Sequence, residues 1–308
     1  MNARPETVRF VADPGSGYAL LDSGDGARLE RWGTVVLDRP DPQAPWPRAG
    51  AASVWAGAQG RFTATALTRG DWQFHRPLPR PWVLPYRAGT TDLEFLLEPT
   101  GFKHVGVFPE QAVNWAYLRE RLGAGAAVLN LFGYTGAASV AARAAGADVT
   151  HVDAVRQVVD WARRNLDHNG LAGVRWVVED ALHFARGEVR RGRRYDAILL
   201  DPPTWGVGPK GTKWKLEDHL SLLLREVVAL LAPGGHLILN TYSGLSPLAV
   251  AAWLQRIAPE VAWQELAAGE LCLQGGRRAP AADRNARARP PRRLKSALCA
   301  TFAVPKEP

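Results

Sequence analysis

The segment Asp201-Pro202-Pro203-Thr204-Trp205 follows the apolar run YDAILL and carries the most specific chemistry in this sequence. Proline has a fixed φ and no N–H group, so two in succession form a rigid turn whose carbonyl oxygens project as acceptors. Trp205 then offers a flat ring on which a base can stack, an interaction worth ~1–3 kcal/mol. We expect this turn to hold a planar nitrogen heterocycle, with Asp201, Pro202, Pro203 and Trp205 as catalytic residues. The alternative is a turn without a ligand.

Three further turns carry residues that suit an adenosine-containing ligand. In the segment 130–136 (NLFGYTG), Gly133 and Gly136 permit a tight turn and a close approach of the backbone to a ligand. Asp153 ends the next apolar run, where a carboxylate can accept both hydroxyls of a ribose. Asp180 follows the third run and can accept from the exocyclic amine of adenine. For both aspartates, capping of the next helix is the alternative.

Five apolar runs predict strands that are covered on both faces. They lie at 126–132, 148–154, 174–180, 195–203 and 236–243, with helical stretches between them at 137–145, 155–169, 181–191 and 217–231. Alternating strands and helices predict a parallel sheet with right-handed crossovers, and such sheets bind ligands at the carboxyl ends of their strands. The turns described above therefore meet at one edge of the predicted sheet.

Residues 1–100 have a different pattern, with short alternating runs separated by Gly, Asp and Pro. Turn signals such as SGDG at 23–26 predict hairpins. We expect two domains, a β-rich one over 1–103 and an α/β one over 104–308. The chain has 308 residues, of which 46% are hydrophobic and 22% charged, as in ordinary globular proteins. It has no apolar run near the roughly 20 residues of a membrane span and no secretory signal, which favours a cytoplasmic protein without a membrane partner.

The cysteine count and the distribution of charge bear on which metals and macromolecules the protein could bind. Cys272 and Cys299 are too few for a disulfide scaffold or a Cys-built zinc site, so we expect no metal. The net charge is +8, and the stretch from Arg277 to Lys295 alone carries +7. Arginine stays charged and pairs bidentately with phosphate, so this stretch indicates a nucleic-acid partner. A solvated loop in an arginine-rich chain is the alternative.

With NLFGYTG, HVDA, VVEDA and DPPTW in this order, the chain resembles class I S-adenosylmethionine-dependent methyltransferases. Over about 104–245 it is similar to the bacterial family that methylates cytosine C5 or guanine N7 of 23S ribosomal RNA. The segment GVFPEQ at 106–111 resembles the GxFxDQR-type segment that closes over the cofactor in that family, with Glu110 in place of Asp and Ala112 in place of Arg. The resemblance implies an α/β fold with a Rossmann-like seven-stranded methyltransferase sheet and a small β-rich N-terminal domain.

The turns and the resemblance together imply S-adenosyl-L-methionine as the cofactor. Its expected contacts are Phe108, Gln111, Asn130, Phe132, Gly133, Tyr134, Thr135, Gly136, Asp153, Ala154, Asp180, Ala181 and Asp201. The loop 206–215 directly follows Trp205 and has three lysines and an aromatic residue. This composition suits phosphate contacts and base stacking. A solvated loop is the alternative. The residues expected to bind substrate RNA, with ribosomal RNA as the partner, are Lys210, Lys213, Lys215, Arg277, Arg278, Arg292 and Arg293. No feature of the sequence indicates an oligomeric state.

The cysteines also bear on which atom is methylated. Enzymes that methylate the weakly nucleophilic cytosine C5 first add a Cys thiolate to the ring. In the family that the chain resembles, this thiol follows the fourth or fifth strand of the sheet. Tyr242 occupies the corresponding position here, and neither Cys272 nor Cys299 is expected near it. We therefore predict methylation of a base nitrogen without a covalent intermediate. The alternatives are a methyltransferase for a small molecule or protein and a non-catalytic RNA-binding protein. A nicotinamide oxidoreductase is disfavoured because its turn would read GxGxxG.

Overall fold

The computed structural model describes residues 8–12, 17–65, 69–88, 91–208, 211–242, 245–261, 263–274 and 293–304. The chain forms two compact units. The larger unit comprises Met1–Phe10, Val113–Leu271 and Ala297–Pro308, and the smaller unit comprises Val11–Ala112 and Cys272–Ser296. The predicted boundary after residue 103 differs from this division, which runs after Ala112 and assigns segments near both chain ends to the other unit. Neither unit is therefore continuous in sequence.

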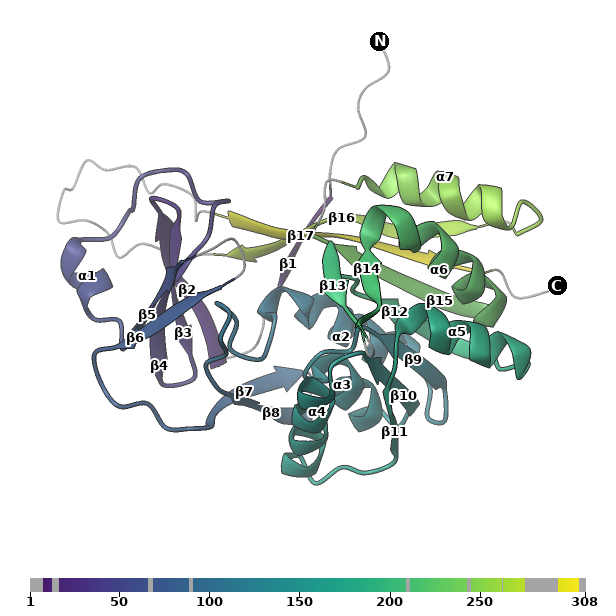
Figure 1. The fold of residues 1–308 in the computed structure, drawn as a ribbon, viewed down its shortest axis with the longest axis horizontal. Coiled ribbons are helices and arrows are strands. Elements are labelled where there is room, and N and C mark those ends of the chain that lie inside the picture. The colour runs from purple at the N-terminus through teal and green to yellow at the C-terminus, as the bar shows by residue number, and fades with distance from the viewer. Residues whose placement is uncertain are drawn as a thin grey trace, which may run out of the picture. The chain divides into compact units, whose positions relative to one another are not determined.

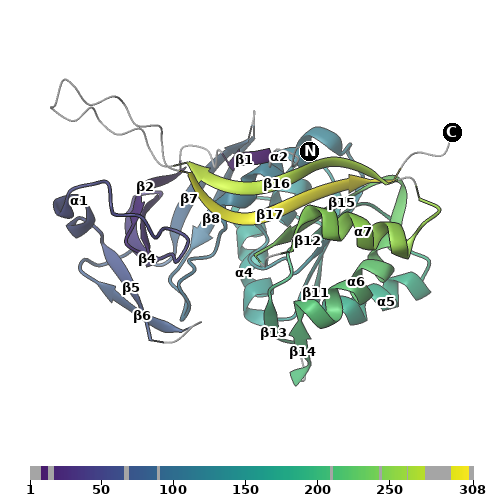
Figure 2. The same ribbon diagram turned by 90° about the horizontal axis from the view of Figure 1, so that it is seen from above.

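The larger unit is built on an eight-stranded sheet with the order β1-β16-β17-β15-β12-β9-β10-β11 (Figures 1 and 2). Its strands are β1 (Val8–Ala12), β9 (Ala127–Leu131), β10 (Asp148–Asp153), β11 (Val174–Val178), β12 (Tyr195–Leu200), β15 (Leu231–Thr241), β16 (Gln264–Gln274) and β17 (Arg293–Ala303). Strands β9, β10, β11, β12 and β15 are parallel, and β17 runs antiparallel to β15.

The predicted α/β fold and its sheet are confirmed, with one strand more than expected. The sequence pattern places residues 8–12 in the N-terminal domain, whereas in the structure they form β1 next to β16 at the edge of the large sheet. A strand in this place pairs backbone groups of β16 that an open edge would leave without partners. The short run carries no periodicity that distinguishes an edge strand of one sheet from a strand of another.

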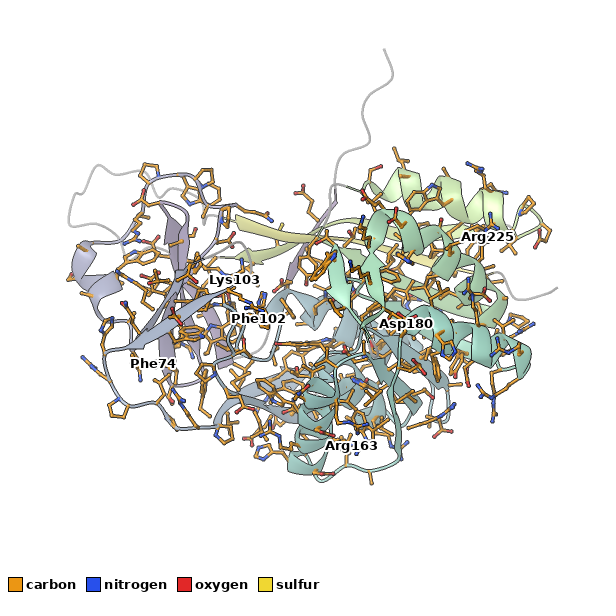
Figure 3. All side chains as sticks on the ribbon, in the orientation of Figure 1. Phe74, Phe102, Lys103, Arg163, Asp180 and Arg225 are labelled. Atoms are coloured by element: carbon orange, nitrogen blue, oxygen red, sulfur yellow. The ribbon has the colours of Figure 1, made fainter. Side chains whose placement is uncertain are left out.

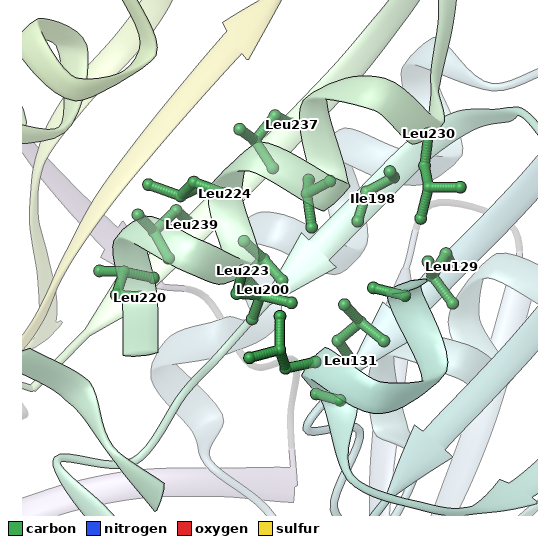
Figure 4. Close-up of a cluster of buried hydrophobic side chains, with 14 of the residues drawn as sticks. Leu129, Leu131, Ile198, Leu200, Leu220, Leu223, Leu224, Leu230, Leu237 and Leu239 are labelled. Carbon is green, nitrogen blue, oxygen red and sulfur yellow. The ribbon is translucent and has the colours of Figure 1, made fainter. Parts of the chain in front are cut away.

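Helices cover both faces of this sheet. They are α2 (Ala112–Arg121), α3 (Ala137–Ala144), α4 (Arg156–His168), α5 (Ala181–Arg190), α6 (Leu216–Leu230) and α7 (Pro247–Ile257). Successive strand residues point to opposite faces, so Val128 packs in the cluster that includes Leu118 of α2, while Leu129 packs in the cluster with α5, α6 and α7. Figure 4 shows the second cluster, which includes Leu223 of α6 and Leu200 of β12.

The five parallel strands bring distant parts of the sequence to one edge. Gly133, Asp153, Asp180, Asp201 and Tyr242 lie at or just after the carboxyl ends of β9, β10, β11, β12 and β15. The register pairs Asn130 with both His151 and Leu199, which fixes the three central strands side by side. The expected meeting of these turns at one edge is thus a consequence of the sheet order.

The segment after Asp201 was expected to be a loop, but it contains a small hairpin. Its strands are β13 (Trp205–Val207) and β14 (Lys213–Lys215), with Trp205 opposite Lys215 and Val207 opposite Lys213. Residues 209 and 210, which include the expected RNA contact Lys210, lie outside the described residues. None of the helices among the described residues has the length and apolarity that crossing a bilayer requires.

The smaller unit is rich in β structure, as expected. A five-stranded sheet has the order β2-β3-β4-β5-β6, and β7 and β8 form a two-stranded sheet. The elements are β2 (Tyr18–Gly24), β3 (Ala27–Trp32), β4 (Val35–Pro40), α1 (Ala52–Ala56), β5 (Gly60–Ala64), β6 (Gly70–Phe74), β7 (Trp82–Ala88), β8 (Thr91–Leu97) and the 3₁₀ helix η2 (Pro109–Gln111). The hairpin predicted from SGDG is confirmed, because Gly24 pairs with Ala27. Within this sheet the buried Glu30 carboxylate accepts from Arg39 at 2.6 Å.

We predict that Leu223→Ala and Leu222→Ala differ sharply in stability although the residues are neighbours in α6. Leu223 is fully buried and Leu222 is 39% exposed. Removing a buried leucine side chain costs about 2–5 kcal/mol, whereas the exposed one costs about 0.5 kcal/mol or less. Urea denaturation of the two variants measures the difference. Equal losses of unfolding free energy would contradict the packing of α6 on the sheet.

Candidate active site

The turn after β9 has an unusual backbone conformation. Phe132 and Tyr134 have φ of 58° and 50°, in the left-handed region that residues other than glycine rarely adopt, and Gly136 has φ of 81°. Such conformations cost on the order of 1 kcal/mol each and are concentrated at functional sites. Gly136 is also the N-cap of α3, so the turn leads directly into a helix N-terminus.

Gly133 is required because a histidine lies directly behind the turn. A Cβ on Gly133 would stand 2.3 Å from Cε1 of His151, which is closer than real Cβ atoms approach anything. The His151 ring is fully buried, and burial lowers its pKa to about 3. The ring is therefore neutral at physiological pH, and it packs edge-on against Trp176 of β11 at 4.9 Å between centroids.

A buried chain of hydrogen bonds holds this histidine. The Asn130 side-chain amide donates to Ser139 Oγ at 2.9 Å, and Ser139 Oγ lies 3.0 Å from His151 Nδ1. Because Ser139 accepts from Asn130, its own hydroxyl proton is available to the histidine nitrogen. On the other side of the turn, the Asn165 amide of α4 donates to the Thr135 carbonyl at 2.8 Å. The turn is thus fixed by neighbouring strands and helices.

Asp153 connects the turns after β9 and β10. Its Oδ2 accepts the Tyr134 N–H and its Oδ1 accepts the Val155 N–H, both at 2.9 Å. Burial raises the pKa of this carboxyl, while hydrogen bonds from Val155, Tyr134 and Ala154 act in the opposite direction. A carboxylate has about four acceptor positions, and the N–H groups of Tyr134, Val155 and Ala154 use up to three of them. The side chain is therefore oriented by the backbone and keeps an acceptor position for a hydroxyl.

Asp180 caps a helix, as the alternative interpretation anticipated. Its Oδ1 accepts the His183 N–H at 2.9 Å at the start of α5, which begins with Ala181. The second oxygen, Oδ2, faces Gly208 of the loop after β13, since a Cβ there would be 3.7 Å away. Figure 3 labels Asp180 beside the hairpin. Capping occupies one oxygen, and contact with adenine stays a prediction for the other.

The turn after β12, Asp201 to Trp205, is anchored by Trp214 to the hairpin and to the turn after β9. The Trp214 indole N–H donates to the Pro203 carbonyl at 2.7 Å, and its ring meets Phe132 edge-on at 4.8 Å. Trp214 is buried, so base stacking by this aromatic of the loop is not what its position supports. Trp205, by contrast, is 57% exposed. One of the two expected proline carbonyls is thus already engaged within the protein.

Four exposed side chains share one face of the hairpin. Trp205 and Val207 of β13 and Lys213 and Lys215 of β14 are exposed, whereas Trp214, which alternates with the lysines, is buried. The pairing of Trp205 with Lys215 sets a cation beside the exposed indole. Lys215 Nζ lies 3.9 Å from Asp218 of α6. This face combines a ring available for stacking with two ammonium groups.

The remaining predicted residues lie elsewhere. Phe108 and the buried Gln111 belong to the smaller unit, and their contact with the cofactor stays a prediction. Arg277, Arg278 and Arg292 lie outside the described residues, and Arg293 begins β17. Sequence reasoning missed Ser139, His151 and Asn165. The visible signal for His151 was a polar residue in the otherwise apolar strand that precedes Asp153.

The cysteine prediction requires a correction. Cys272 is buried in β16, and the register pairs the backbone of Cys299 with Asn240, two residues before Tyr242. β17 pairs with β15, and this pairing brings the backbone of Cys299 close to the turn after β15. Within the described residues no group of three or more His, Cys, Asp or Glu side chains could hold a metal ion.

Three features together define a class of fold. An antiparallel strand, β17, lies next to the last parallel strand, a tight glycine turn follows β9, and an acid ends β10. These features define the class of S-adenosylmethionine-dependent methyltransferases. Residues 48–265 match the model of the S-adenosylmethionine-dependent methyltransferase family, and the chain belongs to this family. The protein is therefore an enzyme whose cofactor is S-adenosylmethionine. The acceptor position left on Asp153 and the helix N-terminus that follows the turn at Gly136 fit this cofactor.

Relatives support this assignment. The crystal structure of a SAM-dependent methyltransferase from Agrobacterium tumefaciens is 36% identical, with a TM-score of 0.83 over 98% of this chain and 97% of that one. The chain is also similar to the ribosomal RNA large subunit methyltransferases K/L of Shewanella frigidimarina and Methylococcus capsulatus. The identities are 32% and 43%, over 48% and 37% of this chain. The matched regions span 21% and 16% of those two longer proteins.

We predict that Asp153→Asn weakens S-adenosylmethionine binding and removes its dependence on acid pH. An amide presents one acceptor where the carboxylate presents two, and loss of the charged partner to a hydroxyl costs about 1–3 kcal/mol. Because the pKa of Asp153 is raised, the wild-type carboxyl protonates, and affinity falls, at a higher pH than for an ordinary aspartate.

Calorimetric titrations between pH 4.5 and 8 measure both effects. The matched control is Asp160→Asn on the exposed side of α4, which should bind like the wild type. Unchanged affinity in Asp153→Asn would remove this residue from the cofactor site.

Proposed function

We propose that this methyltransferase modifies a nitrogen atom of an RNA base, with ribosomal RNA as its substrate, in the cytoplasm. The observation that carries the proposal is the exposed face of the hairpin that follows the turn after β12. Trp205, Lys213 and Lys215 lie together on this face. Flat rings interleaved with cations are typical of surfaces that bind single-stranded nucleic acid, because rings stack on bases and cations neutralise phosphates. The names of the ribosomal RNA relatives agree with this class of substrate.

The cofactor would be held by the turns after β9, β10 and β11. Residues 130–136 would contact its amino-acid part, Asp153 its ribose and Asp180 with Ala181 its adenine. S-adenosylmethionine supplies an electrophilic methyl group when bound. The protein needs to place the atom that accepts the methyl group in line with it. Positioning of this kind lowers the activation barrier of a bimolecular reaction by on the order of 7–11 kcal/mol.

Asp201 and the carbonyl of Pro202 would orient the base. Both follow β12 directly, and Trp214 occupies the other proline carbonyl, that of Pro203. A rigid Pro-Pro turn restrained by this bond keeps the Pro202 acceptor in one direction. Donor groups on the edge of a base can then pair with Asp201 and Pro202 while the ring stacks on Trp205.

A nitrogen acceptor fits the residues at the strand ends better than a carbon acceptor. A ring nitrogen already has a lone pair, whereas carbon C5 of cytosine requires a thiolate. The turn after β12 has no cysteine, and the turn after β15 presents Tyr242, which is 40% exposed. Cys299 is a central residue of β17, in a strand that is hydrogen-bonded between β15 and β16.

We predict that Trp205→Ala lowers turnover on RNA by roughly tenfold to a hundredfold, because a lost stacking contact costs about 1–3 kcal/mol. Its binding should keep the wild-type dependence on salt, since stacking releases no counterions. Lys213→Gln with Lys215→Gln should instead flatten the plot of log affinity against log salt by ~0.7 per lost phosphate contact. Trp205→Phe is the matched control and should retain most activity. Full activity of Trp205→Ala would exclude stacking on this ring.

We predict that Cys272→Ala with Cys299→Ala retains nearly full turnover, because no thiolate takes part in methylation of a nitrogen. Methyl incorporation from labelled S-adenosylmethionine is the measurement, and Asp201→Ala serves as the inactive reference. The contradictory outcome is loss of activity in the cysteine variant, together with a covalent adduct between the wild type and RNA that contains 5-fluorocytosine.

A further inference from the structure

We infer that the larger unit has a second RNA-binding surface, at the edge of the sheet opposite the candidate active site. We call it the basic edge, and it consists of Arg186, Arg190, Arg191, Arg193 and Arg194, all exposed. These five arginines fall within nine residues, and the single acid among them is Glu188. The inference rests on the proposed function, because it takes RNA as the polyanion that this surface contacts.

The backbone that carries the basic edge is a rigid helix end. Helix α5 ends at Arg190, and Gly192 follows with φ of 65°. The Arg193 N–H donates to the Glu188 carbonyl at 3.1 Å, and the Gly192 N–H donates to the Val189 carbonyl at 2.9 Å. This pair of bonds is a Schellman motif, in which a left-handed glycine closes the helix. The backbone that carries the arginines after the helix is therefore held in one conformation.

Glu188 does not neutralise the basic edge. Its side chain is fully buried and accepts from the Tyr195 hydroxyl at 2.6 Å. Burial by itself raises the pKa of this carboxyl, but hydrogen bonds from Tyr195 and Arg175 outweigh it, and the net shift is downward. The carboxylate is therefore ionised, and its one charge is shared by Arg175 and Arg191, both at 3.2 Å. Two guanidinium groups around one carboxylate leave an excess positive charge at the surface.

The other arginines divide into anchored and unanchored groups. The Arg194 guanidinium donates to the Ala229 carbonyl at the end of α6, and Arg186 lies 3.4 Å from Glu226. Within the part of the chain that the structure describes, the guanidinium groups of Arg190 and Arg193 have neither a hydrogen-bond nor an ion-pair partner. The two unanchored groups are exposed on a fixed turn between anchored neighbours. A planar guanidinium in this setting suits bidentate contact with phosphate.

The location favours a long polyanion over a small anion. Strand β12 begins at Tyr195, next to the basic edge, and ends at Leu200, next to Asp201 of the candidate active site. Six residues of strand span about 20 Å. One RNA molecule that follows the protein surface from Trp205 to the opposite end of the sheet would contact both the candidate active site and the basic edge. We therefore assign the basic edge to the phosphate backbone of the RNA that is methylated, away from the target base.

The test compares two double variants that remove equal charge. Arg190→Gln with Arg193→Gln removes the unanchored arginines and leaves the Glu188 contacts intact. Arg163→Gln with Arg256→Gln, on α4 and α7, is the matched control, and Figure 3 labels Arg163. Fluorescence anisotropy with a labelled 20-nucleotide single-stranded RNA measures affinity between 50 and 200 mM salt. S-adenosylmethionine binding, measured by calorimetry, should be unchanged in both variants.

We expect the basic-edge variant to bind roughly twentyfold more weakly at 0.1 M salt, with a salt slope that is lower by ~1.4, since each phosphate contact on a single strand contributes ~0.7. The control variant should keep the wild-type slope. Equal slopes for the two variants, with RNA binding by the wild type intact, would overturn the basic edge alone. Absence of RNA binding by the wild type would overturn both this inference and the proposed substrate.

Discussion

The hydrogen bonds that Asp153 accepts from Tyr134 and Val155 are the contacts on which the candidate active site depends. They connect the turn after β9 to the start of the segment after β10, at Tyr134 and Val155. The first of these residues has a left-handed backbone, so the carboxylate stabilises a conformation that the chain disfavours. We propose that the acceptor position left on the same side chain binds the cofactor's ribose. One carboxylate thus both shapes the site and presents acceptors in it.

The turn also needs support from below, which comes from neutral polar groups. His151 fills the space behind Gly133 and contacts Ser139, and burial keeps the imidazole uncharged. A charged ring would attract counterions or water into a layer that has to be dry and close-packed. The parallel strands then separate two chemistries on opposite edges of one sheet, with acceptors at the carboxyl ends and arginines around Glu188 at the amino ends. The candidate methyl-transfer site and the proposed basic edge therefore lie at opposite ends of the same strands.

Much of the larger unit was predictable because its strands are continuous apolar runs and its turns have residues with few conformational alternatives, as at Gly136 and Pro202. The contributions of distant segments were not. The pairing of β1 with β16 and the return of Cys299 beside Asn240 depend on long-range register, which no local pattern encodes. The burial of Trp214 and the exposure of Trp205 follow from the alternation of a hairpin that was expected to be a loop. The Glu188 cluster was hidden because a single acid in an arginine run does not reveal its burial.

The central claim is that the methyl group goes to a nitrogen of an RNA base, and mass spectrometry tests it most directly. Ribosomal RNA from a strain that lacks the gene is incubated with the purified enzyme and isotopically labelled S-adenosylmethionine, digested to nucleosides and fragments, and mapped. The account predicts one labelled nucleotide, methylated on a base nitrogen and unmethylated in RNA from the deletion strain. A label on carbon C5 of cytosine would contradict the chemistry, and a label found only in protein or small molecules would contradict the substrate.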